Sequence, residues 1–162
     1  MDWQIPLLIS AVVFAAFLIF KMRPTWSSDG REAAGLLKEA EKRVADAKDD
    51  TARAQALADA GDACAKLHRT NAAVNFYAKA LKAMPSKAIV DRASTSLSRR
   101  PLAIEKLMWR HLANGPWTGP AREPALAALS ALIHVYDRSP SRSPRARAIE
   151  HALSALGQQA KT

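Results

Sequence analysis

The chain has 162 residues, enough for one domain of ordinary size and a short additional segment. Apolar residues make up 49% of the chain and aromatic residues only 6%, with alanine abundant, so we expect an all-α protein. The net charge is +9, which favours contact with anionic surfaces or acidic partners. The single cysteine, Cys64, excludes an intramolecular disulfide and a zinc site built from cysteines.

The N-terminal segment contains an uncharged apolar run at residues 5–20. As a helix this run would be roughly 24 Å long, slightly short of the roughly 30 Å hydrocarbon core, and flanking residues can extend it. A cleaved signal peptide would need a basic start and a small-residue cleavage site, and a buried core helix would need a polar face. The run has none of these features. We therefore predict a signal anchor, a single transmembrane helix, within residues 1–23.

The charges around this anchor predict its orientation. Lys21 and Arg23 follow the run, whereas only Asp2 precedes it. The positive-inside rule then places the N-terminus outside and the rest of the chain in the cytoplasm. A periplasmic or lumenal domain is the alternative, and it would violate this asymmetry. The alanine- and arginine-rich composition is typical of a bacterial inner-membrane protein.

After a linker at residues 24–30, the chain alternates amphipathic helical patterns with turn signals. Asp49, Pro85, Pro101 and Gly115 mark turns between the patterns. Short connections between helices predict antiparallel hairpins, and we expect one helical domain over residues 31–158. The expected helices cover about 30–48, 51–68, 71–84, 87–98, 101–113, 121–137 and 144–157, with a tail at 159–162.

Two of these helices carry a recognisable pattern of small, apolar and aromatic residues within residues 54–87. Small residues at Gly61 and Ala73 would let the two helices approach closely, and Pro85 cannot continue the second helix. The pattern resembles one tetratricopeptide repeat, although Cys64 stands where an aromatic residue is usual. A generic alanine-rich hairpin is the alternative. The signature positions are Leu57, Ala60, Gly61, Cys64, Ala73, Tyr77, Ala80 and Pro85.

The resemblance also implies a binding surface. In tetratricopeptide repeats the first helix usually lines a concave groove that binds a peptide. Asp62 and Lys66 lie four residues apart, so they could instead pair with each other on the helix surface. The partner-binding groove implied by the resemblance consists of Gln55, Ala58, Asp62, Ala65 and Lys66.

No pattern in the sequence indicates catalysis. The four histidines lack metal-ligand spacing, and no glycine-rich phosphate loop is present, so we predict neither enzymatic activity nor a cofactor. The basic patch formed by Arg138, Arg142, Arg145 and Arg147 could contact anionic lipid or an acidic partner. The simpler interpretation is a solvated loop between two helices. We do not expect nucleic-acid binding, because interleaved aromatic residues are missing.

These observations predict a membrane-tethered adaptor or scaffold that resembles tetratricopeptide-repeat proteins and recruits a protein partner of unknown identity. Its layout is similar to that of mitochondrial outer-membrane import receptors. One alternative is a structural subunit of a membrane complex, since Ala11, Ala15 and Ala16 would let the anchor pack against other spans. Another is a binder of anionic membrane or nucleic-acid surfaces through the basic C-terminal region.

Overall fold

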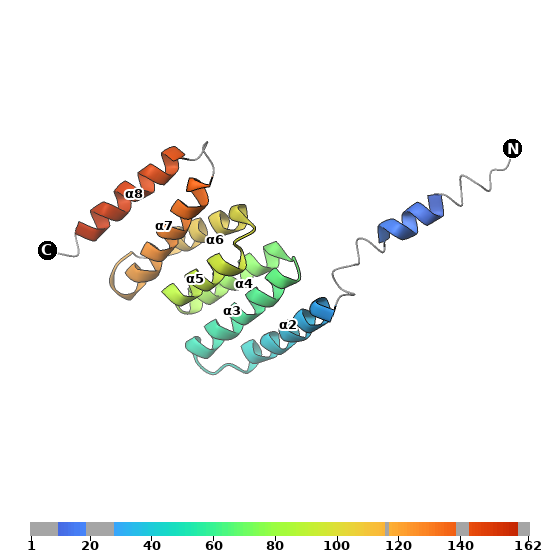
Figure 1. The fold of residues 1–162 in the computed structure, drawn as a ribbon. Coiled ribbons are helices and arrows are strands. Elements are labelled where there is room, and N and C mark those ends of the chain that lie inside the picture. Colours follow the sequence, from blue (N-terminus) through green and yellow to red (C-terminus); the bar gives the residue numbers. More distant parts are fainter. Residues whose placement is uncertain (1–9, 19–27, 116, 139–142, 159–162) are drawn as a thin grey trace.

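The computed structural model describes residues 10–18, 28–115, 117–138 and 143–158. All regular structure in these ranges is helical, which confirms the all-α prediction (Figure 1). The ends of the helices from α2 onward differ by no more than two residues from those expected. The elements are α2 (Ser28–Asp46), α3 (Asp50–Lys66), α4 (Thr70–Ala83), α5 (Lys87–Ser96), α6 (Pro101–Asn114), a 3₁₀ turn η1 (Gly119–Ala121), α7 (Arg122–Asp137) and α8 (Ser143–Gln158).

Helix boundaries follow from capping residues and prolines. Asp49 is the N-cap of α3, and its carboxylate accepts a hydrogen bond from the backbone N–H of Ala52. The α4 helix ends at Ala83, because the residue that precedes Pro85 is biased towards an extended backbone. Pro101 opens α6, where its missing N–H costs little.

The turn between α3 and α4 places a non-glycine residue in the left-handed region. His68 has a φ of 58°. Its N–H donates to the carbonyl of Ala65, and the N–H of Arg69 donates to the carbonyl of Cys64. This pair of bonds is a Schellman motif, which usually has glycine at the left-handed position. The turn is short enough to bring α3 and α4 together as a hairpin.

The helices stack in two layers. The α3, α5 and α7 helices follow one another in one layer, and α4 and α6 lie together in a second layer (Figure 1). The α2 helix packs along α3, and α8 packs along α7.

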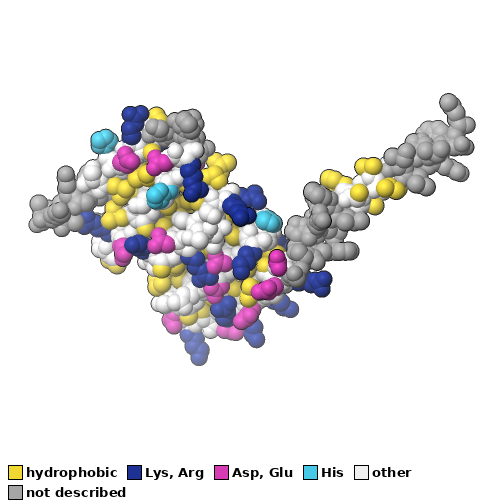
Figure 2. All heavy atoms as spheres, viewed as in Figure 1, with side chains coloured by type: hydrophobic (Ala, Val, Ile, Leu, Met, Phe, Trp, Pro, Cys, Tyr) yellow, Lys and Arg dark blue, Asp and Glu magenta, His cyan; other side chains and the backbone are white. Residues whose placement is uncertain are grey.

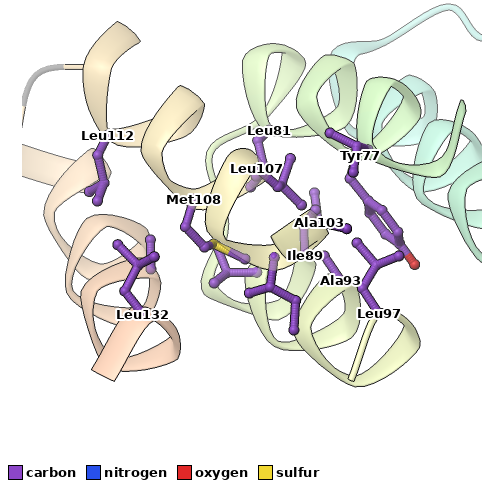
Figure 3. Packing of buried hydrophobic residues seen from close by; sticks show 14 of the residues in the cluster. Tyr77, Leu81, Ile89, Ala93, Leu97, Ala103, Leu107, Met108, Leu112 and Leu132 are labelled. Atoms are coloured by element: carbon purple, nitrogen blue, oxygen red, sulfur yellow. The ribbon is translucent and has the colours of Figure 1, made fainter. Parts of the chain in front are cut away.

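A continuous apolar core joins the two layers (Figure 3). Tyr77 from α4, Leu107 and Met108 from α6 and Leu132 from α7 are all fully buried. Each such side chain stabilises the fold by about 1.5–3 kcal/mol relative to an exposed one. The core thus fixes the relative positions of α4, α6 and α7, on which the surface features described below depend.

The predicted signal anchor over residues 1–23 falls mostly outside the described residues. Within it, residues 10–18 are helical, and Val12, Val13 and Phe14 are 60–63% exposed. Among the described helices, none is both long enough and apolar enough to span a bilayer. The predicted linker ends earlier than expected, because α2 already begins at Ser28.

Candidate functional site

Of the five residues expected to form one partner-binding groove, two line the same groove in the structure. Gln55 is exposed and Ala58 is buried, and both line the same groove. Asp62 is engaged in hydrogen bonds within the fold, and Ala65 is partly buried. Lys66 lines a different hollow near the start of α2. The structure therefore places only the first two of these residues in a shared groove.

That groove lies between the C-terminal part of α2, α3 and the start of α5, and we call it the α2–α3–α5 groove. Its volume is about 550 Å³, within the range of ligand and peptide sites. Its floor is made largely of alanines, and its rim carries charged side chains. The described lining residues are Arg43, Asp46, Ala47, Ala52, Gln55, Ala56, Ala58, Asp59, Met84, Ser86, Ala88, Ile89 and Arg92.

Three of the four charged residues that line this groove are paired with one another. Asp59 accepts from Arg43 at 2.8 Å and from Arg92 at 2.6 Å. Arg92 also donates its Nε hydrogen to Asp62. These contacts join α2, α3 and α5, and the carboxylates are only about a quarter exposed. Asp62 therefore pairs with an arginine thirty residues away, and the alternative of a pair with Lys66 is wrong.

Asp62 also anchors the buried tyrosine of α4. The Tyr77 hydroxyl donates to the Asp62 carboxylate, which accepts a further bond from the Ser96 hydroxyl. Burial, together with the hydrogen bond to Asp62, raises the pKa of Tyr77, so the phenol remains a donor. On the other side of the ring, a Cβ added to Gly61 would lie 2.9 Å from the Tyr77 Cε2 atom. Only glycine leaves room for the ring at this crossing.

The eight residues that carry the repeat resemblance occupy a single region of the fold. Seven of them are buried between α3 and α4, and Pro85 is exposed just after α4. Cys64 is 1% exposed, and burial raises the pKa of its thiol, so the reactive thiolate is disfavoured. These residues pack the hairpin and present no reactive group at the surface.

A second groove lies where the C-terminal ends of α4 and α6 meet the loop that leads into α7. We call it the α4–α6 groove, and its volume is about 660 Å³. No aspartate or glutamate occurs among the described residues that line it. His111 is partly buried there, and burial lowers the pKa of its imidazole. The described lining residues are Ala78, Lys79, Leu81, Lys82, Pro85, Arg110, His111, Leu112, Asn114, Gly115, Trp117, Ala121 and Ala125.

The predicted basic patch near the C-terminus is partly neutralised by the fold. Arg145 of α8 lies 3.5 Å from the carboxylate of Glu105 in α6. Arg138 and Arg147 are exposed, and Arg142 lies outside the described residues. Glu105 also accepts a 2.9 Å hydrogen bond from a buried tyrosine of α7. The Arg145 contact thus ties α8 to α6.

Sequence reasoning missed the charged residues that line the two grooves. Asp59 and Asp62 lie three positions apart on α3, so one helix face carries two acids, and this signal was present in the sequence. The partners Arg43 and Arg92 come from other helices, and no local pattern links them to α3. Within the described ranges, no group of His, Cys, Asp or Glu side chains is placed to hold a metal ion.

Comparison with known proteins identifies no relative: no family model, curated protein or solved structure matches this chain.

Proposed function

We propose that this chain is a membrane-tethered adaptor without catalytic activity, which presents the α2–α3–α5 groove to a protein partner. The observation that carries the proposal is the groove itself. Its alanine floor can accept apolar side chains, and its volume of about 550 Å³ suits a short segment of a partner. Two of the five residues that the tetratricopeptide resemblance implies, Gln55 and Ala58, line it.

The charged rim supports a role in protein recognition. Arg43, Asp59 and Arg92 already have defined partners, so they are held in place before any ligand arrives. Side chains that are ordered in the free protein lose less entropy on binding. Gln55 and Ala88 lie exposed beside them and complete a mixed polar and apolar lining. A rim of balanced charge suits a folded or internal peptide segment rather than a strongly charged ligand.

The exposed apolar residues near the N-terminus support tethering to a membrane. Val12, Val13 and Phe14 lie in the helical range 10–18 and are each more than half exposed. Apolar helix surface of this kind is stabilised by insertion into hydrocarbon. The anchor would hold the adaptor at the bilayer, with the helical domain on the cytoplasmic side as the flanking charges predict.

Site-specific crosslinking in the native membrane tests the proposal. A photoreactive amino acid is introduced at Gln55 or Ala88 in the groove, and at the exposed Ser130 on α7, outside both grooves, as a control. We expect one protein of defined mass to be attached at both groove positions and not at Ser130. The same product should disappear when the groove is filled by Ala88→Arg in the Gln55-labelled protein.

Two results would count against the adaptor. Products that contain only lipid or a second copy of this chain would favour the structural-subunit alternative. Equal capture from Ser130 and from the groove would show that proximity in the membrane, rather than the groove, produces the crosslink.

A further inference from the structure

The three cations of the α4–α6 groove lack counter-charges in the described part of the chain. Lys79, Lys82 and Arg110 line the groove, and none of them forms an ion pair with a described residue. Lys79 lies over the ring of Phe76 at 5.9 Å, and Arg110 donates to the side-chain oxygen of Asn75 at 3.2 Å. The ring and the amide contact Lys79 and Arg110 without neutralising their charge. The side chains that line the groove therefore make it positively charged.

The helix ends at this groove do not cancel its charge. The α4 and α6 helices both end here, at Ala83 and Asn114. Each helix C-terminus is equivalent to about half a negative charge. Two such ends offset about one of the three cationic charges, so a net positive potential remains for an anionic ligand.

The groove also has an apolar floor. Leu81, Leu112 and Ala125 are 2–5% exposed and reach its lining from three different helices. Trp117 forms part of the wall, where its indole N–H donates to the Leu112 carbonyl at 3.0 Å. A free phosphate or a carboxylate alone would leave this apolar surface uncovered. The lining is complementary to a ligand that has negative charges flanking an apolar group.

We propose that the α4–α6 groove binds an acidic peptide segment of a partner protein. One apolar side chain of the segment rests on the Leu81–Leu112 floor, and flanking carboxylates face Lys79, Lys82 and Arg110. The residues that line this site differ from those of the α2–α3–α5 groove, and its occupation does not depend on ligand binding there.

The lining favours a peptide over nucleic acid. Single-stranded nucleic acid is bound through exposed aromatic faces on which bases stack, together with a track of cations along the backbone. Trp117 is the groove's single described aromatic side chain apart from His111, and it is partly buried against the core. Three cations around one apolar floor define a compact site rather than a track.

Peptide binding to the full chain in uncharged detergent tests this proposal. The probes are fluorescent peptides with a central leucine flanked by aspartate and glutamate, the same peptide with asparagine and glutamine flanks, and the acidic peptide with glycine in place of leucine. We expect binding of the acidic leucine peptide alone, weakened when salt rises from about 0.05 M to about 0.5 M. Combining K79Q, K82Q and R110Q should weaken binding at least about tenfold, a loss of about 1.4 kcal/mol shared among three contacts.

The matched control combines K38Q, K42Q and K48Q, three exposed lysines outside this groove, and removes the same charge. It should keep binding within about twofold of the unsubstituted chain, because screened charges at a distance contribute little. An equal loss in both variants would overturn the proposal in favour of non-specific attraction. Absence of binding at about 1 mM peptide would also overturn the proposal. Tighter binding of an oligonucleotide or of anionic vesicles than of the acidic peptide would overturn it as well. Since all six positions are exposed, circular dichroism should show the same helix content in every variant.

Discussion

The two grooves meet at the turn between α4 and α5, and they differ in how their charged side chains are paired. At the α2–α3–α5 groove, Arg43 and Arg92 are matched by the carboxylates of Asp59 and Asp62. At the α4–α6 groove, Lys79 and Arg110 contact only neutral groups, and Lys82 forms no ion pair with a described residue. Figure 2, in the orientation of Figure 1, shows acidic and basic side chains intermixed on the visible face of the domain. The overall positive charge therefore says little about where an anionic ligand would bind.

This difference separates arginines that stabilise the fold from cations that are available to a ligand. A carboxylate that already accepts hydrogen bonds from three side chains, as Asp62 does, has little capacity left for a partner. Its removal should destabilise the protein. Removal of a cation with only neutral partners should leave the fold intact and change recognition instead. Each prediction below tests one side of this contrast.

The largest effect is expected at Asp62. Asp62→Ala removes the acceptor of the Tyr77 hydroxyl and one partner of Arg92. A buried hydroxyl without an acceptor costs about 1–3 kcal/mol, and a partly exposed ion pair adds up to about 1 kcal/mol. We expect the free energy of unfolding to fall by about 2–3 kcal/mol, measured by urea denaturation of the full chain in uncharged detergent.

The control for this prediction is Asp59→Ala, three residues away on the same helix. Asp59 pairs with Arg43 and Arg92 but contacts no buried hydroxyl. Its loss should cost only about 0.5–1 kcal/mol, as expected for partly exposed ion pairs. If the two variants lost equal stability, the link between Asp62 and Tyr77 would have no energetic importance.

Asp62 also illustrates what could not be derived from the sequence. Helix boundaries were predictable because Asp49, Pro85 and Pro101 act within one turn of the chain. The only rule available for Asp62 was the local one, which favoured Lys66 as its partner. The actual partner, Arg92, reaches it through the packing of α5 on α3, a relation that no periodicity encodes.

The lining of the α4–α6 groove could not be derived from the sequence for the same reason. The α4–α6 groove combines the ends of two helices with a loop that follows the second, so its lining is scattered over almost fifty residues from Ala78 to Ala125. By contrast, Gly61 and Tyr77 belong to one hairpin, and their spacing is part of a recurring pattern. Contacts within a hairpin follow a recognisable spacing in the sequence, whereas contacts between hairpins depend on the tertiary arrangement.

A smaller change in the free energy of unfolding is expected from substituting two glycines, one closely packed and one with open space around it. In Gly61→Ala the new methyl group would meet the Tyr77 ring, which is already held at its hydroxyl by Asp62. Overpacking of this kind costs about 1–3 kcal/mol, offset by about 1 kcal/mol of improved helix propensity. We expect net destabilisation of about 1 kcal/mol, measured by urea denaturation.

The control is Gly35→Ala on α2. Its new methyl group meets no atom within 4 Å, so this substitution should instead stabilise the protein. Destabilisation by both would argue against close packing as the cause.

The acid sensitivity of the α4–α6 groove provides a third test. Burial lowers the pKa of His111 below the value of 6.5 of an unperturbed histidine, so the unfolded chain binds more protons than the folded one as pH falls through 6.5. Acidification therefore lowers stability, starting near pH 6.5 and continuing to the folded pKa. Between about pH 7.5 and about pH 5.5, the unsubstituted protein should lose more stability than His111→Gln.

The same substitution at His134, an exposed position of α7, serves as the control. His134→Gln should keep the full pH-dependent loss, because His111 is still present. Equal pH dependence in all three proteins would show that other groups dominate the acid response.

The smallest effect on stability is expected for the cations of the α4–α6 groove. Lys79 and Lys82 are exposed and have no carboxylate partner in the described chain, so replacing both with glutamine should change the free energy of unfolding by less than about 0.5 kcal/mol. Arg92→Gln should cost more, about 1 kcal/mol, because it leaves Asp59 and Asp62 without a cation between them. Urea denaturation of the two variants in parallel measures the contrast directly. A larger loss of stability from the lysine pair than from Arg92→Gln would mean that the cations of the α4–α6 groove stabilise the fold. The contrast between the two grooves would then not hold.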